Sequence, residues 1–300
     1  MKDNTKLRSN ILLFLAAFFW GIAFVAQEEG AKYVGPFTFN AVRMTIGGIV
    51  LLPFIAIINR NEKREKEHGS FKNLLIGGAL CGGALCIASA LQQAGLGYTT
   101  ASKAGFITAL YMVIVPIIGL FFKKRVQPLV WLAVVLSLMG MYMLCVTDGF
   151  KEINIGDLIV MCSAFFYSAQ ILLVDHFVKS IDPVKLSCAQ FFAVGLFSAV
   201  PMLIIERPAL TDIALAWVPL LYTGIFSCGI AYTFQVMGQK GAKPVVASLI
   251  MSLESVFAAI AGVVLLPATN TLSLPQLVGC VLMFGAIILS QIPVKSKKVS

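Results

Sequence analysis

Residues 11–27 read ILLFLAAFFWGIAFVAQ, an apolar stretch without a charged side chain. A helix rises about 1.5 Å per residue, so about 20 such residues cross the ~30 Å of hydrocarbon in a bilayer. Lipid offers an exposed backbone amide no hydrogen-bond partner, and spanning stretches of this kind therefore form helices. The sequence predicts an all-α integral membrane protein with ten transmembrane helices: residues 11–27, 37–58, 73–96, 104–122, 127–147, 158–174, 186–205, 213–236, 245–266 and 274–293.

The composition of the 300 residues favours a membrane setting, because 59% of them are hydrophobic and 12% are charged. Soluble chains average roughly 45 to 50% apolar and about 25% charged residues, so this chain has too little charge to cover a surface that faces water. The net charge of +9 could suggest nucleic acid, but Lys and Arg occupy short gaps between apolar runs instead of one polar face. We expect a surrounding lipid bilayer and no nucleic-acid partner.

Lys and Arg are distributed unevenly between the two sides of the membrane. Eighteen of them fall on the side of the N-terminus, whereas four fall on the opposite side: Lys32, Lys103, Lys151 and Arg207. Basic residues mark the cytoplasmic side, so we expect both termini in the cytoplasm, as an even number of spans requires. The first stretch could be a cleaved signal peptide, but its apolar run is long and no clean cleavage site follows, so we expect it to be retained.

The chain also repeats itself. A shift of 147 positions aligns residues 17–20 (AFFW) with residues 164–167 (AFFY), and a shift of 143 aligns Gln92 with Gln235. Each half holds five spans, an odd number, so the second copy enters the membrane from the opposite side and the repeats are inverted. Halves of this kind exchange conformations and open a central site first to one side and then to the other. The two predicted repeats are residues 1–150 and residues 151–300.

Motifs of soluble enzymes are missing from the sequence. It contains no G-x-x-x-x-G-K-[ST], H-E-x-x-H or G-x-S-x-G pattern, and its histidines are His68 and His176. The seven Cys lie in apolar stretches with neither a disulfide framework nor zinc spacing. We therefore expect a protein that is not an enzyme, with no catalytic residue, no metal and no cofactor.

Two charged residues fall well inside predicted spans, Arg43 in the second and Glu254 in the ninth. Burying an ionised group at that depth costs at least about 2.5 to 3.5 kcal/mol, so each should face a polar cavity or a partner. We interpret Arg43 as a substrate anchor and Glu254 as a substrate or proton site. The alternatives are a structural bond between helices for either residue, and for Arg43 a side chain that extends to the membrane surface.

The repeat extends this set to a group of predicted substrate-binding residues. Under the shifts of 147 and 143, Arg43 aligns with Gln190 and Glu254 aligns with Tyr111. Sites between repeats draw on both halves. The alternative for Gln92 and Gln235 is a tie between helices. For Trp20 and Tyr167 the alternative is packing at the membrane interface. The complete set is Trp20, Arg43, Gln92, Tyr111, Tyr167, Gln190, Gln235 and Glu254.

Several stretches resemble one known family. They are Trp20-Gly21 in the first span, Arg43 early in the second, residues 98–107 (YTTASKAGFI) leading into the fourth and residues 252–259 (SLESVFAA) in the ninth. With five-plus-five spans in inverted repeat, the chain resembles EamA-type members of the drug/metabolite transporter superfamily over essentially all of its length. It departs from them at residues 266–270 (LPATN), where members commonly have Leu-Gly-Glu, and at Ser255, where members often have Pro.

The resemblance implies a secondary transporter of the bacterial cytoplasmic membrane, often an exporter of amino acids, other metabolites or drugs, that works by alternating access around a cavity lined by both repeats. Our reading of the residues likewise indicates a carrier for a small organic solute. The alternative is a channel or a membrane scaffold that transports nothing. Proton linkage and uncoupled facilitation both stay open, and the sequence gives neither the substrate, the direction nor the oligomeric state.

Overall fold

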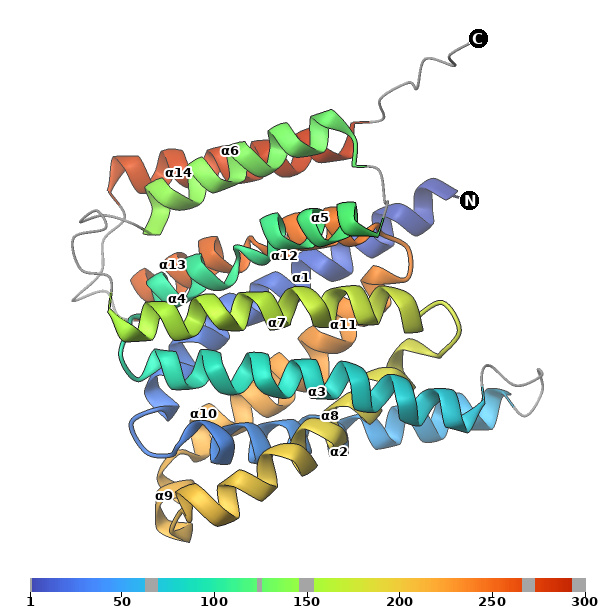
Figure 1. Ribbon diagram of the computed structural model, residues 1–300, viewed down its shortest axis with the longest axis vertical. Coiled ribbons are helices and arrows are strands. Elements are labelled where there is room, and N and C mark those ends of the chain that lie inside the picture. Colours follow the sequence, from blue (N-terminus) through green and yellow to red (C-terminus); the bar gives the residue numbers. More distant parts are fainter. Residues whose placement is uncertain (1, 63–69, 123–125, 146–153, 266–272, 293–300) are drawn as a thin grey trace.

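The computed structural model describes residues 2–62, 70–122, 126–145, 154–265 and 273–292 as a bundle of helices (Figure 1). Every regular element in these ranges is a helix, which confirms the all-α prediction, and η1 and η2 are π-helices. The elements are α1 (Lys2–Gly30), α2 (Pro36–Glu62), α3 (Phe71–Leu96), α4 (Ala101–Thr108), α5 (Tyr111–Phe121), α6 (Pro128–Cys145), α7 (Ile155–Phe177), α8 (Pro183–Pro201), η1 (Met202–Glu206), α9 (Leu210–Leu215), α10 (Trp217–Tyr222), η2 (Thr223–Tyr232), α11 (Thr233–Gln239), α12 (Pro244–Met251), α13 (Glu254–Leu265) and α14 (Leu274–Gln291).

Within the described ranges, nine helical segments are long and apolar enough to cross a membrane. A shorter apolar segment, Pro128–Met143 in α6, corresponds to the expected span 127–147. Spanning helices are therefore present by length and apolar character, whereas the count of ten stays a prediction. Parts of the expected cytoplasmic charge lie outside the described residues, at residues 63–69, 123–125 and 293–300. Of the two departures from the family pattern, the one at residues 266–270 also lies outside them.

Two of the expected spans are interrupted near their middle. The span 104–122 is divided into α4 and α5 at Ala109–Leu110, and the span 245–266 is divided into α12 and α13 at Ser252–Leu253. The sequence predicts each as one stretch, and each instead consists of two half-helices. The two breaks lie 143 residues apart, which is the shift that the internal repeat gives for this part of the chain.

The backbone follows the same path at both breaks. In the first, the amide of Leu110 donates to the carbonyl of Ile107 over 3.2 Å, and in the second the amide of Leu253 donates to the carbonyl of Ile250 over 3.2 Å. These bonds span three residues instead of four, which tightens the turn to 3₁₀ geometry. A new half-helix therefore begins in mid-span at both places.

Helices from the two halves of the chain are interleaved. α1 packs against α13, α11 and η2, whereas α7, its counterpart under the shift of 147, packs against α3, α4 and α5. α2 pairs with α8, and α6 pairs with α14 at one edge of the bundle (Figure 1). The start of α1 lies beside the end of α14, where Lys6 Nζ donates to the carbonyl of Gln291 over 3.3 Å. Both ends of the described chain therefore lie at the same end of the bundle.

Close contacts between the halves depend on small residues. α1 approaches α13 at Gly21, where an added Cβ would overlap Phe257 Cβ and lie 2.7 Å from the backbone nitrogen of Ala258. α2 approaches η2 at Gly47, where an added Cβ would lie 2.6 Å from Cys228 Cβ. Lipid is as apolar as the helix surfaces, so helices in a membrane associate largely through such close packing.

Gly21→Ala is expected to destabilise the protein by about 1 to 3 kcal/mol, because the backbone of α13 must move to admit the new methyl group. Gly285→Ala in α14 is the matched control, since its added Cβ meets no atom within 4 Å and Ala favours a helix over Gly by about 0.5 to 1 kcal/mol. In purified protein, the melting temperature of Gly21→Ala should fall and that of Gly285→Ala should stay level or rise. Equal melting temperatures would contradict the tight α1–α13 contact.

Candidate functional site

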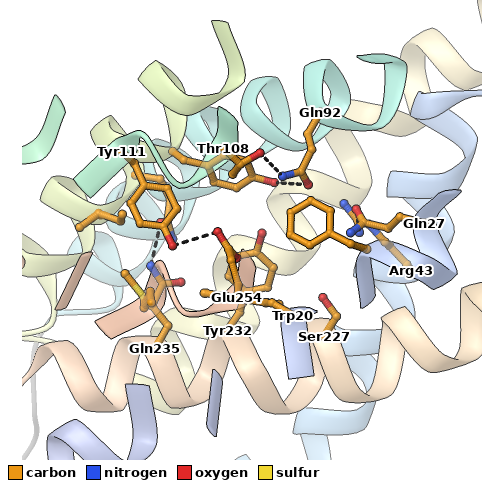
Figure 2. A pocket seen from close by; sticks show the side chains of 15 residues that line it. Trp20, Gln27, Arg43, Gln92, Thr108, Tyr111, Ser227, Tyr232, Gln235 and Glu254 are labelled. Atoms are coloured by element: carbon orange, nitrogen blue, oxygen red, sulfur yellow. Dashed lines mark hydrogen bonds between the residues drawn. The ribbon is translucent and has the colours of Figure 1, made fainter. Parts of the chain in front are cut away.

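A cavity lies in the centre of the bundle between helices of both halves of the chain (Figure 2). Two half-helices, α5 and α13, begin at its wall. Polar and aromatic side chains predominate in the lining, although the surrounding helices are apolar. The lining residues are Trp20, Phe24, Gln27, Arg43, Gln92, Thr108, Tyr111, Tyr167, Gln170, Ile171, Ser227, Tyr232, Gln235, Met251 and Glu254.

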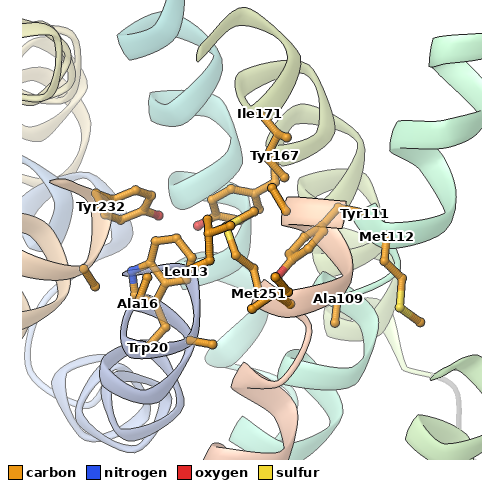
Figure 3. Packing of buried hydrophobic residues seen from close by; sticks show 14 of the residues in the cluster. Leu13, Ala16, Trp20, Ala109, Tyr111, Met112, Tyr167, Ile171, Tyr232 and Met251 are labelled. Atoms are coloured by element: carbon orange, nitrogen blue, oxygen red, sulfur yellow. The ribbon is translucent and has the colours of Figure 1, made fainter. Parts of the chain in front are cut away.

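The free space inside the cavity is small. The cavity leaves about 30 Å³ for the centres of water molecules. One water needs ~10 to 15 Å³ of such space, so about two waters fit. Aromatic rings fill much of the wall, and Trp20 packs edge to face on Tyr232 with 4.7 Å between ring centroids (Figure 3). A solute larger than two waters therefore fits only when the walls move apart.

Tyr111 and Glu254 meet at the two helix breaks. Tyr111 is the first residue of α5, and Glu254 is the first residue of α13. The Tyr111 hydroxyl donates to Glu254 Oε1 over 2.9 Å, and each residue is only 4% exposed (Figure 2). The breaks thus bring a carboxyl group and a phenol, 143 residues apart in the sequence, into direct contact inside the cavity.

Arg43 reaches the cavity from α2 and is 1% exposed. Its Nε and Nη2 donate to Asn40 Oδ1 over 3.1 and 2.8 Å, and its Nη1 donates to Gln27 Oε1 over 2.7 Å. The guanidinium also lies 5.2 Å from the centre of the Phe39 ring. All these partners are neutral, and the side chain is enclosed within the bundle. The ion pairs seen among the described residues do not include Arg43; they are, for example, Lys32–Glu29 and Lys179–Asp175.

Gln92 connects the two halves through its side-chain amide. Gln92 Nε2 donates to Thr108 Oγ1 over 2.9 Å, and the Tyr167 hydroxyl donates to Gln92 Oε1 over 3.0 Å. Both ends of the amide therefore have partners, one on α4 and one on α7. Buried polar groups are stabilising only when they are satisfied in this way.

Gln190 lies on α8 and is not part of the cavity lining. Its Oε1 accepts a bond from Gln170 Nε2 over 3.3 Å, and Gln170 Oε1 accepts a bond from Gln235 Nε2 over 3.1 Å. Gln190 is thus connected to the cavity lining through Gln170.

Two polar atoms on the cavity wall have no hydrogen-bond partner among the described residues. They are the donor Trp20 Nε1 and the acceptor Gln235 Oε1. Buried polar groups in native proteins nearly always bind a protein group or an ordered molecule. A donor and an acceptor are therefore available to whatever occupies the cavity.

Seven of the eight predicted residues line this one cavity, and Gln190 is the exception. Sequence reasoning missed five polar lining residues, which are Gln27, Thr108, Gln170, Ser227 and Tyr232. The two amides carry the signal that selected Gln92, an amide inside an apolar stretch, and they align with each other under the shift of 143. Ser227 and Tyr232 lie on η2, and the sequence gives no sign of its π-helical turns.

Tyr111→Phe is expected to lower the free energy of unfolding by about 1 to 3 kcal/mol, because the buried Glu254 carboxyl group loses its hydrogen-bond donor. Tyr98→Phe removes the same hydroxyl from a side chain that is 66% exposed, so a change within about 0.5 kcal/mol is expected. Chemical unfolding of the purified variants measures both values. A Tyr111→Phe variant as stable as Tyr98→Phe would contradict the importance of this contact.

A second hollow, of about 450 Å³, opens one helical turn from the cavity. Three helices, α5, α7 and α11, line both the cavity and this hollow. On each of them a residue that lines the hollow lies four positions after one that lines the cavity; these residues are Val115, Asp175 and Gln239. One turn of helix is about 5.4 Å, so the two spaces are separated by a thin layer of side chains. Lys179, Lys240 and Lys243 also line this hollow.

At the opposite end of the bundle, where α2 begins, carboxylates of the second half of the chain accept hydrogen bonds from residues of the first half. Glu206 accepts bonds from the amides of Phe37 and Thr38 over 2.9 and 2.7 Å, at the first turn of α2. Asp157 Oδ1 accepts a bond from Thr99 Oγ1 over 2.6 Å. Carboxylates at a helix N-terminus satisfy free amides and interact favourably with the helix dipole. These bonds hold the two halves together at the end away from the second hollow.

Comparison with known proteins decides the family. The sequence profile of the EamA-like transporter family matches residues 7–146 and again residues 154–291. The chain belongs to the EamA-like transporter family. The resemblance seen in the sequence is therefore confirmed, and the protein is a multi-pass membrane transporter.

Curated relatives of this EamA-like transporter carry transporter names. An "Uncharacterized transporter" of Archaeoglobus fulgidus is 31% identical over an alignment of 290 positions, which covers 95% of this chain and 86% of the relative. "Uncharacterized transporter YwfM" of Bacillus subtilis is 25% identical over an alignment of 313 positions, which covers 99% of this chain and 97% of the relative. A solved crystal structure superposes with a TM-score of 0.72 at 19% identity, over 94% of this chain and 96% of the other, and shows that the two share a fold.

Proposed function

We propose that this EamA-like transporter is a secondary transporter of the bacterial cytoplasmic membrane that moves a small organic solute by alternating access, with export as the favoured direction. The observation that carries the proposal is the central cavity. Seven of its lining residues precede residue 150 and eight follow it, and most of them are polar or aromatic. Solute sites between two halves of a membrane carrier have this composition, because rocking one half against the other changes which side has access.

The proposed architecture is two inverted repeats, residues 1–150 and residues 151–300. The two breaks at equivalent positions, the exchange of partners between α1 and α7, and the two matches of the family profile support it. In such an arrangement each repeat supplies one broken helix to the shared cavity, and discontinuous helices are a common way to build a solute site in mid-membrane.

Seven residues are proposed to contact the solute in the opened cavity: Trp20, Arg43, Gln92, Tyr111, Tyr167, Gln235 and Glu254. Gln190 is proposed to act indirectly, by fixing the amide of Gln170. A channel is a weaker proposal, because conduction needs a continuous wet path and the space at the centre holds about two waters.

The two ends of the cavity suggest how the cycle proceeds. The larger hollow lies toward the end with the Lys-rich connections, which we assign to the cytoplasm, and a solute reaching it is one turn from the cavity. Opening to the other side requires the bonds of Glu206 and Asp157 to break, since they join the halves there. In the other state the halves lose these bonds and gain new contacts at the cytoplasmic end. The two closed arrangements then have similar energy, as alternating access needs.

Glu254→Gln is expected to slow transport in proteoliposomes about tenfold or more, because it removes the one carboxylate among the described residues that line the cavity. Ser248→Ala is the control: the Ser248 hydroxyl bonds the carbonyl of Val245, outside the cavity lining, so transport should change little. If Glu254 also carries a proton, wild-type transport varies between about pH 5 and pH 8 and the variant loses that variation. Identical rates for Glu254→Gln and wild type across this range would remove Glu254 from the proposed mechanism.

Both termini are expected on the cytoplasmic side, as the distribution of Lys and Arg requires. Protease-cleavable tags added to each end, tested in intact cells and in inverted vesicles, measure the two orientations. Both tags should resist external protease in cells and be cut in inverted vesicles. Termini on different sides would contradict the inverted repeat, because five-plus-five spans return the chain to its starting side.

A further inference from the structure

The cavity holds a buried basic group and a buried acidic group that do not bond each other. Among the described residues, Arg43 donates to the neutral oxygens of Asn40 and Gln27, and Glu254 accepts a bond from the hydroxyl of Tyr111. The two side chains reach the cavity from α2 and α13 and lie apart in Figure 2, with no ion pair between them. A separated acid and base of this kind gain none of the attraction that a close ion pair supplies.

Each charged group retains bonding capacity on its own wall. The guanidinium has five N–H groups, and three of them serve the bonds to Asn40 and Gln27. Glu254 Oε1 accepts from Tyr111, and its second oxygen is engaged in no hydrogen bond among the described residues. A donor of the cavity wall is thus left over at Arg43 and an acceptor at Glu254.

The wall also offers uncharged surface. Trp20, Phe24, Ile171 and Met251 all line the cavity. Ligand sites of this kind combine apolar surface, which binds the body of the solute, with a few polar groups that fix its orientation. A solute that pairs with both groups must therefore carry its own two charges some distance apart, on an uncharged body.

We propose that the solute is a zwitterion whose carboxylate binds Arg43, whose ammonium group binds Glu254, and whose charges are separated by a flexible or apolar spacer. This inference rests on the proposed transport function and names the substrate class of that same cavity. A carboxylate suits the planar guanidinium, which binds it through two parallel bonds. A solute with one charge would leave either Arg43 or Glu254 buried without a counter-charge, so both single-charge analogues should be rejected.

Three probes of equal chain length test the charge pattern: 6-aminohexanoate, hexanoate and hexylamine. Binding is measured as the rise in melting temperature of the purified protein, and transport as uptake into proteoliposomes, with protein-free vesicles correcting for permeation. 6-Aminohexanoate should bind about tenfold more tightly than either analogue. A series from glycine to 8-aminooctanoate then measures the spacing, and glycine, with adjacent charges, should bind poorly.

Charge-removing variants test which residue binds which end of the solute. Arg43→Gln should lose the preference for 6-aminohexanoate over hexylamine, and Glu254→Gln should lose the preference over hexanoate. Arg43→Lys and Glu254→Asp, which keep the charges, should retain most of each preference and guard against a general loss of folding. Glu29→Gln and Lys32→Gln remove the same charges from an exposed ion pair outside the cavity, and they should leave all preferences unchanged.

The outcomes separate this inference from the proposed function. A protein that moves other solutes but binds the single-charge probes as well as any zwitterion of the series would overturn the inference and leave the transporter in place. Preferences that persist unchanged in Arg43→Gln and Glu254→Gln would also overturn it. A folded protein that moves nothing from a broad panel of metabolites would overturn the proposed function, and the melting-temperature series would still decide the charge pattern of the cavity.

Discussion

Hydrocarbon gives a polar group no partner, and this one constraint governs most of the structure. It makes the spanning segments helical, and it permits interrupted backbone only where protein or a cavity surrounds the break. Both breaks obey this limit, since the residues that follow them, Tyr111 and Glu254, line the central cavity and bond each other. The same constraint explains why the polar side chains of so many helices converge on one place, because there they find the hydrogen-bond partners that lipid does not provide.

The hydrogen bonds between these converging side chains also restrict access to the cavity. Bonds such as Tyr167 to Gln92 join the two halves at the centre, while Glu206 joins them at one end. With room for only about two waters, the cavity admits a solute when some of these bonds give way. A solute that replaces them, and that supplies counter-charges to Arg43 and Glu254, offsets the loss; water in the same space offers weaker compensation.

The amino-acid pattern was sufficient to find seven of the fifteen residues that line the cavity, because a charge or amide inside an apolar stretch has few stable environments in a membrane. Arg43, Gln92 and Glu254 stand out on that ground alone, and their symmetry partners Tyr111 and Gln235 follow from the repeat. The same reasoning selected Gln190, which lies one residue behind the wall, because alignment of repeats fixes a helix position but not the direction in which its side chain bonds.

The sequence by itself determined the helical class, the membrane setting, the apolar spans and the residues whose polarity demands an internal partner, since each of these depends on side-chain chemistry and on local order along the chain. Only the tertiary structure decided that two spans break, that η2 winds as a π-helix, and that Gln27 and Tyr232 join the cavity. Those features depend on which distant groups come into contact, and the energy of such contacts is not written in any single stretch of the chain.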